Sequence, residues 1–309
     1  MDNLFIMNIS PHSCSTAIGE QEEIVSMKLA VVKIGCIATS PLLDLIFDER
    51  AEREDLEVRV FSSGAKMDLE SCMTVVDSLN NFEPRLVLLV SPNASLEGPT
   101  KVRTNLLENS VPVISLSDAP SKKAWQKKDE RGKKVLVAQE GEGFIIIPSD
   151  SMIGARGEFL DPSEMVLFNS DVLKVLSIGG VIRAIQTIVG KSIDQIKSGK
   201  NLELPSVTIT ADVAMEYANF ANPYAGAKAF AALKIAESVA AVTSKACFKT
   251  KESEDYIPMA AAGHEMMRAA AMLADEAREL EKGQDTVYRT PHGSDGKIKT
   301  KRKLKDKPK

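Results

Sequence analysis

The sequence SMIGARGEFLDPSEMVLFNSDVLKVL, residues 151–176, lies where the pattern of the chain changes. Before it, short apolar runs alternate with helical patterns, and after it long alanine-rich helical patterns dominate. A charged loop is followed by a strong helix start, with Asp161 as N-cap, Pro162 at the first helical position and Glu164 three residues after the cap. The helix carries apolar residues on more than one face, so we expect it to be buried in a bundle or between subunits. A charged loop fixed at its head is a favourable place for a cleft.

Between residues 27 and 150, five apolar runs alternate with helical patterns. The runs are continuous in Val, Ile and Leu, which is typical of parallel strands buried on both faces. The predicted strands are 29–34, 57–61, 85–90, 112–116 and 143–147. Helices are predicted from Ser40-Pro41, from Asp68 to Leu79, near 101–108 and near 122–131. The sequence therefore predicts an α/β fold, a doubly wound parallel sheet with helices on both faces.

The second half of the chain is predicted to form a C-terminal helix bundle with a small β-sheet. Helices are predicted at 161–176, from the Gly179-Gly180 break to about residue 198, at 224–242 and at 258–282. The β-branched stretches 205–210 and 243–250 are predicted to pair as the small sheet. The predicted domains are an α/β domain at 27–150, the bundle at 151–295 and a basic tail at 296–309, which is expected to be mobile. Residues 1–26 are interpreted as a disordered extension, or as the result of a misassigned start with Met27 as the true one.

Composition excludes several classes of protein. The 309 residues are 44% hydrophobic and 27% charged, an ordinary globular balance. The net charge of −4 and the aromatic content of 5% argue against binding to nucleic acid. Four scattered cysteines without a Cys-x-x-Cys motif indicate reduced thiols in a cytoplasmic protein and no zinc site. No apolar run approaches the ~18 residues of a membrane span, so no membrane association is expected.

The loops that follow the predicted strands are small and polar. In a doubly wound sheet, ligands bind at the carboxyl ends of the strands, where these loops lie. The loops are 35–40, 62–64, 91–93 and 117–120. They would allow a flat or phosphorylated ligand to approach the backbone closely. Connecting loops are often small and polar whatever their role, so this pattern alone does not decide for a site.

Common catalytic motifs are absent from the sequence. The stretch 35–40 lacks the spacing of G-x-G-x-x-G, and neither a Walker A motif nor G-x-S-x-G occurs. The three histidines are His12, His264 and His292, and the H-E-M-M-R sequence at His264 is not the H-E-x-x-H of a zinc protease. What remains is a cleft with few acid or base groups. Hydride transfer to a bound cofactor needs orientation and little side-chain chemistry, so it fits such a cleft.

Long motifs in the second half carry a family resemblance. They are MIGARGEFLDPSEM, FNSDVLKVL, NPYAGAKAFAALKIAESVA, YIPMAAAGHEMMRAAAMLADEARELEKG and RTPHG, with LDLIFDERAERED and SGAKMD upstream. In this order they resemble the coenzyme F420-dependent methylenetetrahydromethanopterin dehydrogenases of methanogenic and methane-oxidising archaea. The resemblance extends from Met27 to the C-terminus. The chain departs from the usual loop residues of that family at Cys36, Ala38 and Gly157.

The resemblance implies an archaeal cytosolic homohexamer of one-carbon metabolism, in methanogenesis or its reversal. The implied reaction is reversible hydride transfer between the methylene carbon of the tetrahydromethanopterin-type carrier and C5 of the deazaflavin, coenzyme F420. Its products are methenyltetrahydromethanopterin and reduced coenzyme F420, and no metal is implied. The hydride leaves a carbon between two nitrogens, which stabilise the cation themselves. The protein need only hold the two rings together and exclude water.

Loop position and resemblance together indicate the site residues. The coenzyme is expected on the loops after the first and third strands, at Gly35, Ile37, Ala38, Thr39, Ser91, Pro92 and Asn93. The pterin is expected farther along the chain, at Ser117, Asp118, Ala119, Pro120, Met152, Arg156, Glu158 and His264. No residue is assigned a catalytic role beyond positioning.

Several of these residues could have a purely structural role instead of contacting a ligand. Arg156 and Glu158 can form an ion pair at a helix start, and Asp118 can serve as an N-cap. His264 can be a packed histidine of the core or of an interface. For the whole chain, the alternatives are a nicotinamide-dependent dehydrogenase on the same sheet and a non-enzymatic ligand sensor.

Replacing Arg156 tests the expectation of positioning without acid–base catalysis. Arg156→Ala should weaken pterin binding and raise KM, with a smaller effect on the rate from the bound state. His264→Ala should cost little beyond packing. Single-turnover kinetics measure the two effects separately. If either variant binds normally but transfers hydride more than about 10³-fold more slowly, as expected for a lost acid or base, positioning alone is the wrong account.

Overall fold

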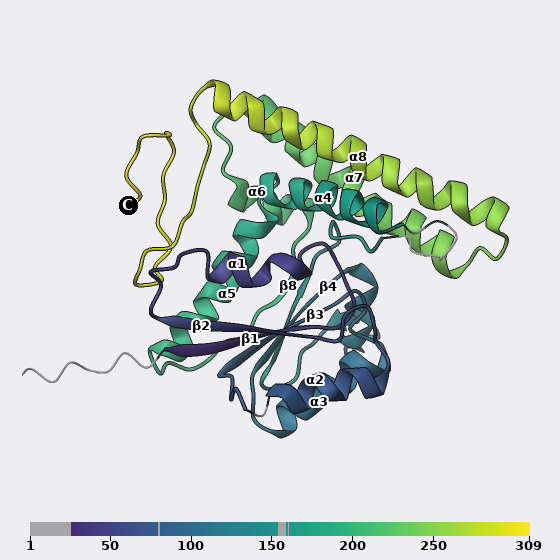
Figure 1. Ribbon diagram of the computed structural model, residues 1–309, viewed down its shortest axis with the longest axis vertical. Helices are drawn as coiled ribbons and strands as arrows, with labels where there is room; N and C mark the ends of the chain where they lie inside the picture. Colours follow the sequence, from purple (N-terminus) through teal and green to yellow (C-terminus); the bar gives the residue numbers. More distant parts are fainter. Residues whose placement is uncertain (1–25, 80, 154–158, 160) are drawn as a thin grey trace, which may run out of the picture.

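The protein has an α/β layer at one end and a helix bundle at the other (Figure 1). The computed structural model describes residues 26–79, 81–153, 159 and 161–309. Arg156, Glu158 and the N-terminal extension, which the sequence analysis singled out, lie outside the described residues.

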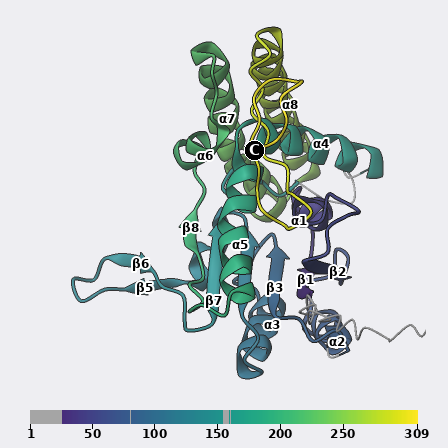
Figure 2. The same ribbon diagram turned by 90° about the vertical axis from the view of Figure 1, so that its left-hand side faces the viewer.

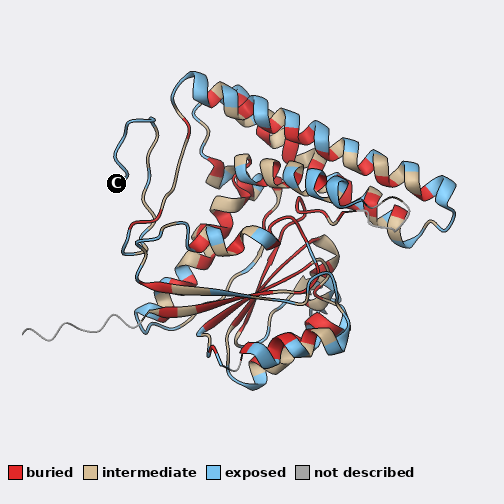
Figure 3. Ribbon diagram, viewed as in Figure 1, coloured by how far each residue is buried: buried red, intermediate tan, exposed pale blue. Residues whose placement is uncertain are grey.

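The α/β layer is built on a six-stranded parallel sheet in the order β2-β1-β3-β4-β7-β8. Its strands are β1 (Met27–Lys33), β2 (Leu56–Ser62), β3 (Leu86–Ser91), β4 (Val113–Ser117), β7 (Glu142–Ile146) and β8 (Ser206–Thr208). Residues of β3 alternate between two hydrophobic clusters, Leu88 and Val90 in one and Val87 and Leu89 in the other. Both faces of the sheet are therefore buried (Figure 3), as the continuous apolar runs predicted. All five predicted strands are confirmed to within two residues.

Helices cover both faces of the sheet. Helices α2 (Leu69–Leu79) and α3 (Glu97–Glu108) cover one face, and α1 (Leu43–Phe47) and α5 (Val181–Lys197) cover the other (Figure 1). A 3₁₀ turn, Ser40–Leu42, leads into α1. The predicted doubly wound architecture is confirmed, and α3 starts four residues earlier than expected.

The bundle contains the four helices α4 (Pro162–Ile178), α6 (Ala211–Ala218), α7 (Pro223–Phe248) and α8 (Ser253–Gly283). Two predicted caps are confirmed. Asp161 accepts a hydrogen bond from the Ser163 amide at 2.7 Å, and Asn222 accepts one from the Tyr224 amide at 2.9 Å. Helices α7 and α8 pack side by side through buried alanines, which let the two backbones approach closely.

The predicted helix near 122–131 is wrong. The chain instead forms a 3₁₀ helix, Ala119–Ala124, and an antiparallel hairpin of β5 (Gln126–Lys128) and β6 (Lys134–Leu136) that projects from the body (Figure 2). Trp125, at the base of the hairpin, is buried and stacks on Phe144 with ring centroids 4.7 Å apart. Its Nε1 donates to Glu142 at 2.7 Å, and Glu142 pairs with Arg103 at 3.0 Å. These distant partners fix a segment whose local composition suggested a solvated helix.

Two further boundaries differ from the sequence predictions. Residues 243–250 do not form a strand, because most of them complete α7, and residues 206–208 join the main sheet beside β7. The small β-sheet is therefore the β5–β6 pair. Helix α8 begins at Ser253 and contains Pro258, although Pro258 was expected to start it. Packing of buried Tyr256 with Ala246 and Ala260 holds the extra turn despite the missing proline N–H.

The basic tail folds back along the body. Bridges join Arg289 to Lys301 and His292 to Ile298, and the guanidinium of Arg302 donates to the Asn219 carbonyl at 2.6 Å. The segment expected to be mobile is thus joined to the segment after α8 and to the end of α6.

Within the described part of the chain, no single helix is long and apolar enough to cross a membrane. Helices α4 and α5 together have the length and composition, but they are bent by 68° where they meet.

The junction of α4 and α5 gives a prediction about stability. Gly180 has φ +93°, and a Cβ there would lie 2.4 Å from the Ala214 carbonyl oxygen of α6. Gly199 has φ +63° but open space around it, so it is a matched control. We expect Gly180→Ala to lower the free energy of unfolding by about 2 kcal/mol or more and Gly199→Ala by about 1 kcal/mol. Urea unfolding measures both, and equal losses would contradict a role for the close approach to α6.

Candidate active site

The order of the sheet reverses between β1 and β3, which is where a doubly wound fold is expected to have its ligand crevice. From β1 the chain continues to β2 on one side, whereas β3, β4 and β7 follow on the other. In open α/β sheets, ligands bind at such a reversal, outside the carboxyl ends of the strands. The loops 35–39 and 91–93, predicted to hold the coenzyme, follow these two strands. The topology therefore brings the predicted coenzyme loops to one edge.

Gly35 lets the loops at this edge approach one another. Its φ is +74°, and a Cβ there would lie 2.9 Å from Met67 Sδ and 3.0 Å from Pro92 Cδ. Its amide donates to the Gly64 carbonyl at 3.1 Å. Any side chain at position 35 would push the loops after β1, β2 and β3 apart.

A buried carboxylate fixes the loop after β1. Asp150, on the loop after β7, accepts hydrogen bonds from the Ala38 amide at 2.8 Å, the Thr39 amide at 3.2 Å and the Thr39 hydroxyl at 2.6 Å. In the sheet, β3 and β4 lie between β1 and β7, so the carboxylate ties together loops that are not neighbours. The hydroxyl of Thr39 is already bonded here, and the side chain of Ile37 is packed in the core.

The loop after β4 holds a second buried carboxyl. Asp118 caps the 3₁₀ helix by accepting from the Ala119 amide, which supports its interpretation as an N-cap. Its Oδ2 atom is buried and has no hydrogen-bond partner among the described residues. The neighbouring loops are joined as well, since the Ala94 amide donates to Ser121 Oγ at 2.8 Å.

Both carboxyls have raised pKa values, and the charge of Asp150 contributes to the shift of Asp118. Burial, together with the charge of Asp150, raises the pKa of Asp118 to about 8 against the opposing effect of the Ala119 amide. Burial raises the pKa of Asp150 to about 6, although its hydrogen bonds with Thr39 and Ala38 lower it. The three donors around Asp150 favour its charge, so Asp118 keeps its proton at neutral pH. A protonated Asp118 can donate a hydrogen bond, which an ionised carboxylate cannot.

His264 lies among aromatic rings of the bundle. Its ring centroid is 5.0 Å from that of Phe159 and 4.5 Å from that of Phe168. Burial lowers its pKa, and its Nε2 has no hydrogen-bond partner within the described ranges. These contacts favour a packed histidine. No contact among the described residues joins it to the loops at the sheet edge.

The predicted site residues fall into two groups by exposure. Partly exposed residues can touch a ligand, and they are Pro92, Asn93, Ala119, Pro120 and Met152. Buried residues shape the floor, and they are Gly35, Ile37, Ala38, Thr39, Ser91, Ser117 and Asp118. Asp150 was missed by the sequence analysis, although an acid just after the fifth apolar run could have drawn attention to it.

Among the residues that the structure describes, no group of three or more His, Cys, Asp or Glu side chains could hold a metal ion.

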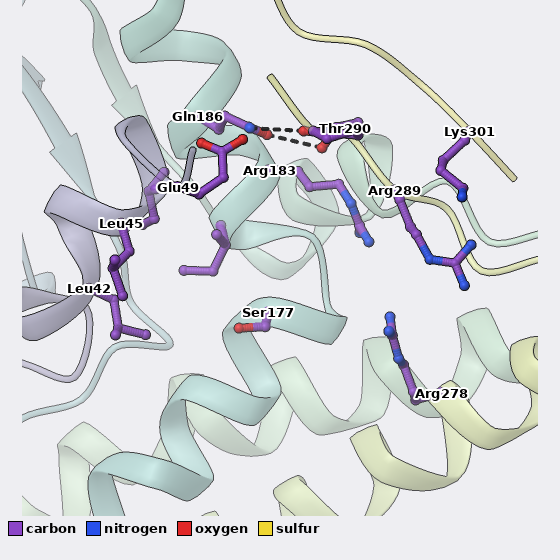
Figure 4. Close-up of a pocket in the computed structure, with 13 residues that line it drawn as sticks. Leu42, Leu45, Glu49, Ser177, Arg183, Gln186, Arg278, Arg289, Thr290 and Lys301 are labelled. Carbon is purple, nitrogen blue, oxygen red and sulfur yellow. Dashed lines mark hydrogen bonds between the residues drawn. The ribbon is translucent and has the colours of Figure 1, made fainter. Parts of the chain in front are cut away.

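A cavity of about 600 Å³ lies apart from this edge, between α1, α5, α8 and the tail (Figure 4). None of the predicted site residues lines it.

The raised Asp118 pKa predicts how stability depends on pH. Because folding raises this pKa, the folded chain holds the proton more tightly than the unfolded chain. The stability gained is full below about pH 4 and is lost as the pH rises to about 8. From pH 4 to pH 8, the native protein should therefore lose stability relative to Asp118→Asn, which stays neutral. Unfolding midpoints across this range measure the difference. Asp77→Asn, at an exposed site on α2, should follow the native curve, and an Asp118→Asn curve parallel to the native one would contradict the shift.

Comparison with known proteins places the chain in a family. A family model described as methylene-5,6,7,8-tetrahydromethanopterin dehydrogenase matches residues 27–309. The F420-dependent methylenetetrahydromethanopterin dehydrogenase of Archaeoglobus fulgidus is 52% identical over 282 residues, 91% of this chain and 99% of that protein. The enzyme of the same name from Methanocaldococcus jannaschii is 48% identical, again over 91% of this chain and 99% of that protein.

A solved structure gives the same result. It is the F420 dependent methylene-tetrahydromethanopterin dehydrogenase in complex with methylene-tetrahydromethanopterin and coenzyme F420. The two folds superpose with a TM-score of 0.84 at 42% identity, over 92% of this chain and 100% of that one. The long motifs, the doubly wound sheet and the bundle thus agree, and the chain belongs to the methylenetetrahydromethanopterin dehydrogenase family.

Proposed function

We propose that the protein catalyses reversible hydride transfer between methylenetetrahydromethanopterin and coenzyme F420, as part of archaeal one-carbon metabolism. One observation carries the proposal: the chain shares its fold and 42% of its residues, over 92% of its length, with a dehydrogenase that was solved with both ligands bound. The edge between β1 and β3 supports it, since its loops are closely packed at Gly35 and Pro92 and carry few acid or base groups.

The chemistry asks the protein to position two rings. When coenzyme F420 is bound, its deazaflavin ring supplies the hydride acceptor. The hydride leaves the methylene carbon with its electron pair, and the two flanking nitrogens stabilise the cation that remains. No proton has to move at the reacting carbon, so no base is required there. The residues of this chain orient the rings and exclude water, which is where the rate acceleration arises.

We place the coenzyme at the edge formed by the loops 35–39 and 91–93. Gly35 and Pro92 bring the two loops together, and Asp150 holds the first of them in place. The pterin is placed toward Met152 and Asp118. Asp118 is buried beneath this edge, where it shapes the floor and does not contact the ring directly.

The reaction itself is tested by absorbance. With purified protein, reduction of the deazaflavin should occur only when the methylene pterin is present. Turnover with a nicotinamide cofactor and none with the deazaflavin would favour the rival dehydrogenase. Saturable binding without any change in deazaflavin absorbance would favour a ligand sensor.

Asp150→Asn tests the positioning of the coenzyme loop. An amide has one acceptor oxygen, so it cannot serve all three donors of Ala38 and Thr39. A lost hydrogen bond to a buried charge corresponds to about tenfold or more in affinity. We expect KM for the coenzyme to rise by about that factor, with a smaller change in kcat. Ser149→Ala is the control, because Ser149 is equally buried and its Oγ has no partner among the described residues. An unchanged coenzyme KM in folded Asp150→Asn would contradict the assignment.

We also propose that the protein is a homo-oligomer, with six subunits as the resemblance implies, and that it is cytoplasmic. Helix α4 was expected to be covered on several faces, yet Val166 and Leu167 are 62% and 57% exposed in the single chain. An apolar helix face of this kind is suited to a subunit interface. Cys36 and Cys72 form no disulfide in the described part of the chain, which suits a reducing compartment.

The oligomer is tested through Leu167. Leu167→Glu places a charge on the exposed α4 face and should lower the mass measured by light scattering. Leu304→Glu changes an equally exposed leucine of the tail, which is 67% exposed, and should leave the mass unchanged. A monomeric, fully active native protein would refute the proposal.

A further inference from the structure

The cavity behind α1 is separate from the crevice at the sheet edge. Leu43 and Phe47 of α1 face the core, whereas Leu45 and Ile46 line the cavity. Helix α1 therefore packs on the core with one side and lines the cavity with the other. The rest of the lining comes from the start of α5, from the last turns of α8 and from the segment that leads into the tail.

Four cationic side chains converge on this cavity. Arg183 comes from α5, Arg278 from α8, and Arg289 and Lys301 from the bridged segments of the tail. Figure 4 shows their charged ends directed into the same space. Arg183 is far in the sequence from the other three, so its meeting with them is a property of the fold and not of a local basic run.

Little negative charge opposes these four groups. The one carboxylate in the lining, Glu49, is already bonded to His292, through the ring Nδ1 at 2.7 Å and the amide at 2.8 Å. Arg183 donates to the Tyr288 carbonyl at 2.6 Å and Lys301 to the Leu304 carbonyl at 2.7 Å. Carbonyl oxygens hold these guanidinium and ammonium groups in place but do not neutralise their charge.

Arg278 is the most available of the four. In the described part of the chain its guanidinium has neither a hydrogen bond nor an ion pair, although it is half-buried. Arg289 uses one of its nitrogens, Nη1, for the Val287 and Arg302 carbonyls and keeps its other donors. Burial and the charges of Arg278 and Arg302 lower the pKa of Arg183 to about 10, as expected where cations repel one another.

We propose that this cavity binds an oxyanion, a phosphate or carboxylate group, between Arg183, Arg278, Arg289 and Lys301. Guanidinium groups bind such anions through two parallel hydrogen bonds, and a lysine adds a point charge. Leu42, Ile46 and Ile182 form an apolar side of the cavity, which suits an anion attached to a carbon skeleton. The anion is either free or carried by a ligand whose ring lies at the sheet edge. The proposal of an anion site does not depend on hydride transfer. Only the possibility that the coenzyme or the pterin carries the anion rests on the proposed function.

Binding of inorganic pyrophosphate to the full-length protein tests the site directly. Calorimetry at constant ionic strength should show saturable binding, weakened by about tenfold or more in Arg278→Gln. Arg268→Gln, ten residues earlier on the same helix and exposed, is the matched control and should bind as the native protein does. Because Arg278 has no protein partner to lose, its replacement should leave the thermal midpoint without anion unchanged or raise it. No saturable binding, or equal binding by the two variants, would overturn the proposal.

Kinetics distinguish the two sources of the anion. The coenzyme and the pterin are each compared with a form that keeps the ring and lacks the anionic side chain. If Arg278→Gln raises KM about tenfold for one intact ligand but not for its shortened form, that ligand supplies the anion. If neither KM changes while pyrophosphate binding is lost, the site takes a free anion. Should the oligomer dissociate in Arg278→Gln, the cations serve a neighbouring subunit and the proposal fails. Absence of turnover would refute the proposed function and leave the calorimetric result intact.

Discussion

The carboxylate of Asp150 is the constraint on which the crevice depends. A charge buried without partners would be costly, and its three donors from Ala38 and Thr39 offset that cost. Because these donors lie on the loop after β1 and the acceptor lies after β7, one interaction spans the middle of the sheet. Its charge also adds to the effect of burial, which is the main cause of the raised pKa of Asp118.

Much of the fold could be predicted from local sequence patterns. Continuous apolar runs marked the parallel strands, and Asp161 and Asn222 marked helix starts through short-range hydrogen bonds. The failures share a long-range cause. Trp125 stacks on Phe144 and turns a supposed helix into the base of a hairpin. The β-branched stretch at 243 stays helical because Thr243 lies against Gly263 of α8, where a Cβ would come within 2.7 Å of its methyl group.

The location of the candidate site, like the strands, could be predicted from local sequence, but its individual contacts could not. The rule that ligands bind beyond the carboxyl ends of strands selected the loops after β1, β3 and β4, and the topology brings these loops together. The rule could not tell which side chains in them face inward, and the side chains of Ile37 and Thr39 prove to be buried. Their assignment to the coenzyme stays a prediction, and it concerns their backbone. Nor could it place His264, whose position depends on Phe159 and Phe168. The pairing of Asp150 with residues 111 and 112 positions away leaves no local pattern.

The folded-back tail also sets an order of events during synthesis. Strands β1 to β4 and β7 all precede residue 150, so their pairing can begin while the rest of the chain is still being made. Arg289 and Lys301 follow the sheet and the bundle in the sequence, so they reach the cavity behind α1 after both have been made. The full repulsion among the cations is therefore postponed until the sheet and the bundle are in place. The cations therefore meet when the sheet and the bundle are already folded, and the stability of these two parts can offset their repulsion.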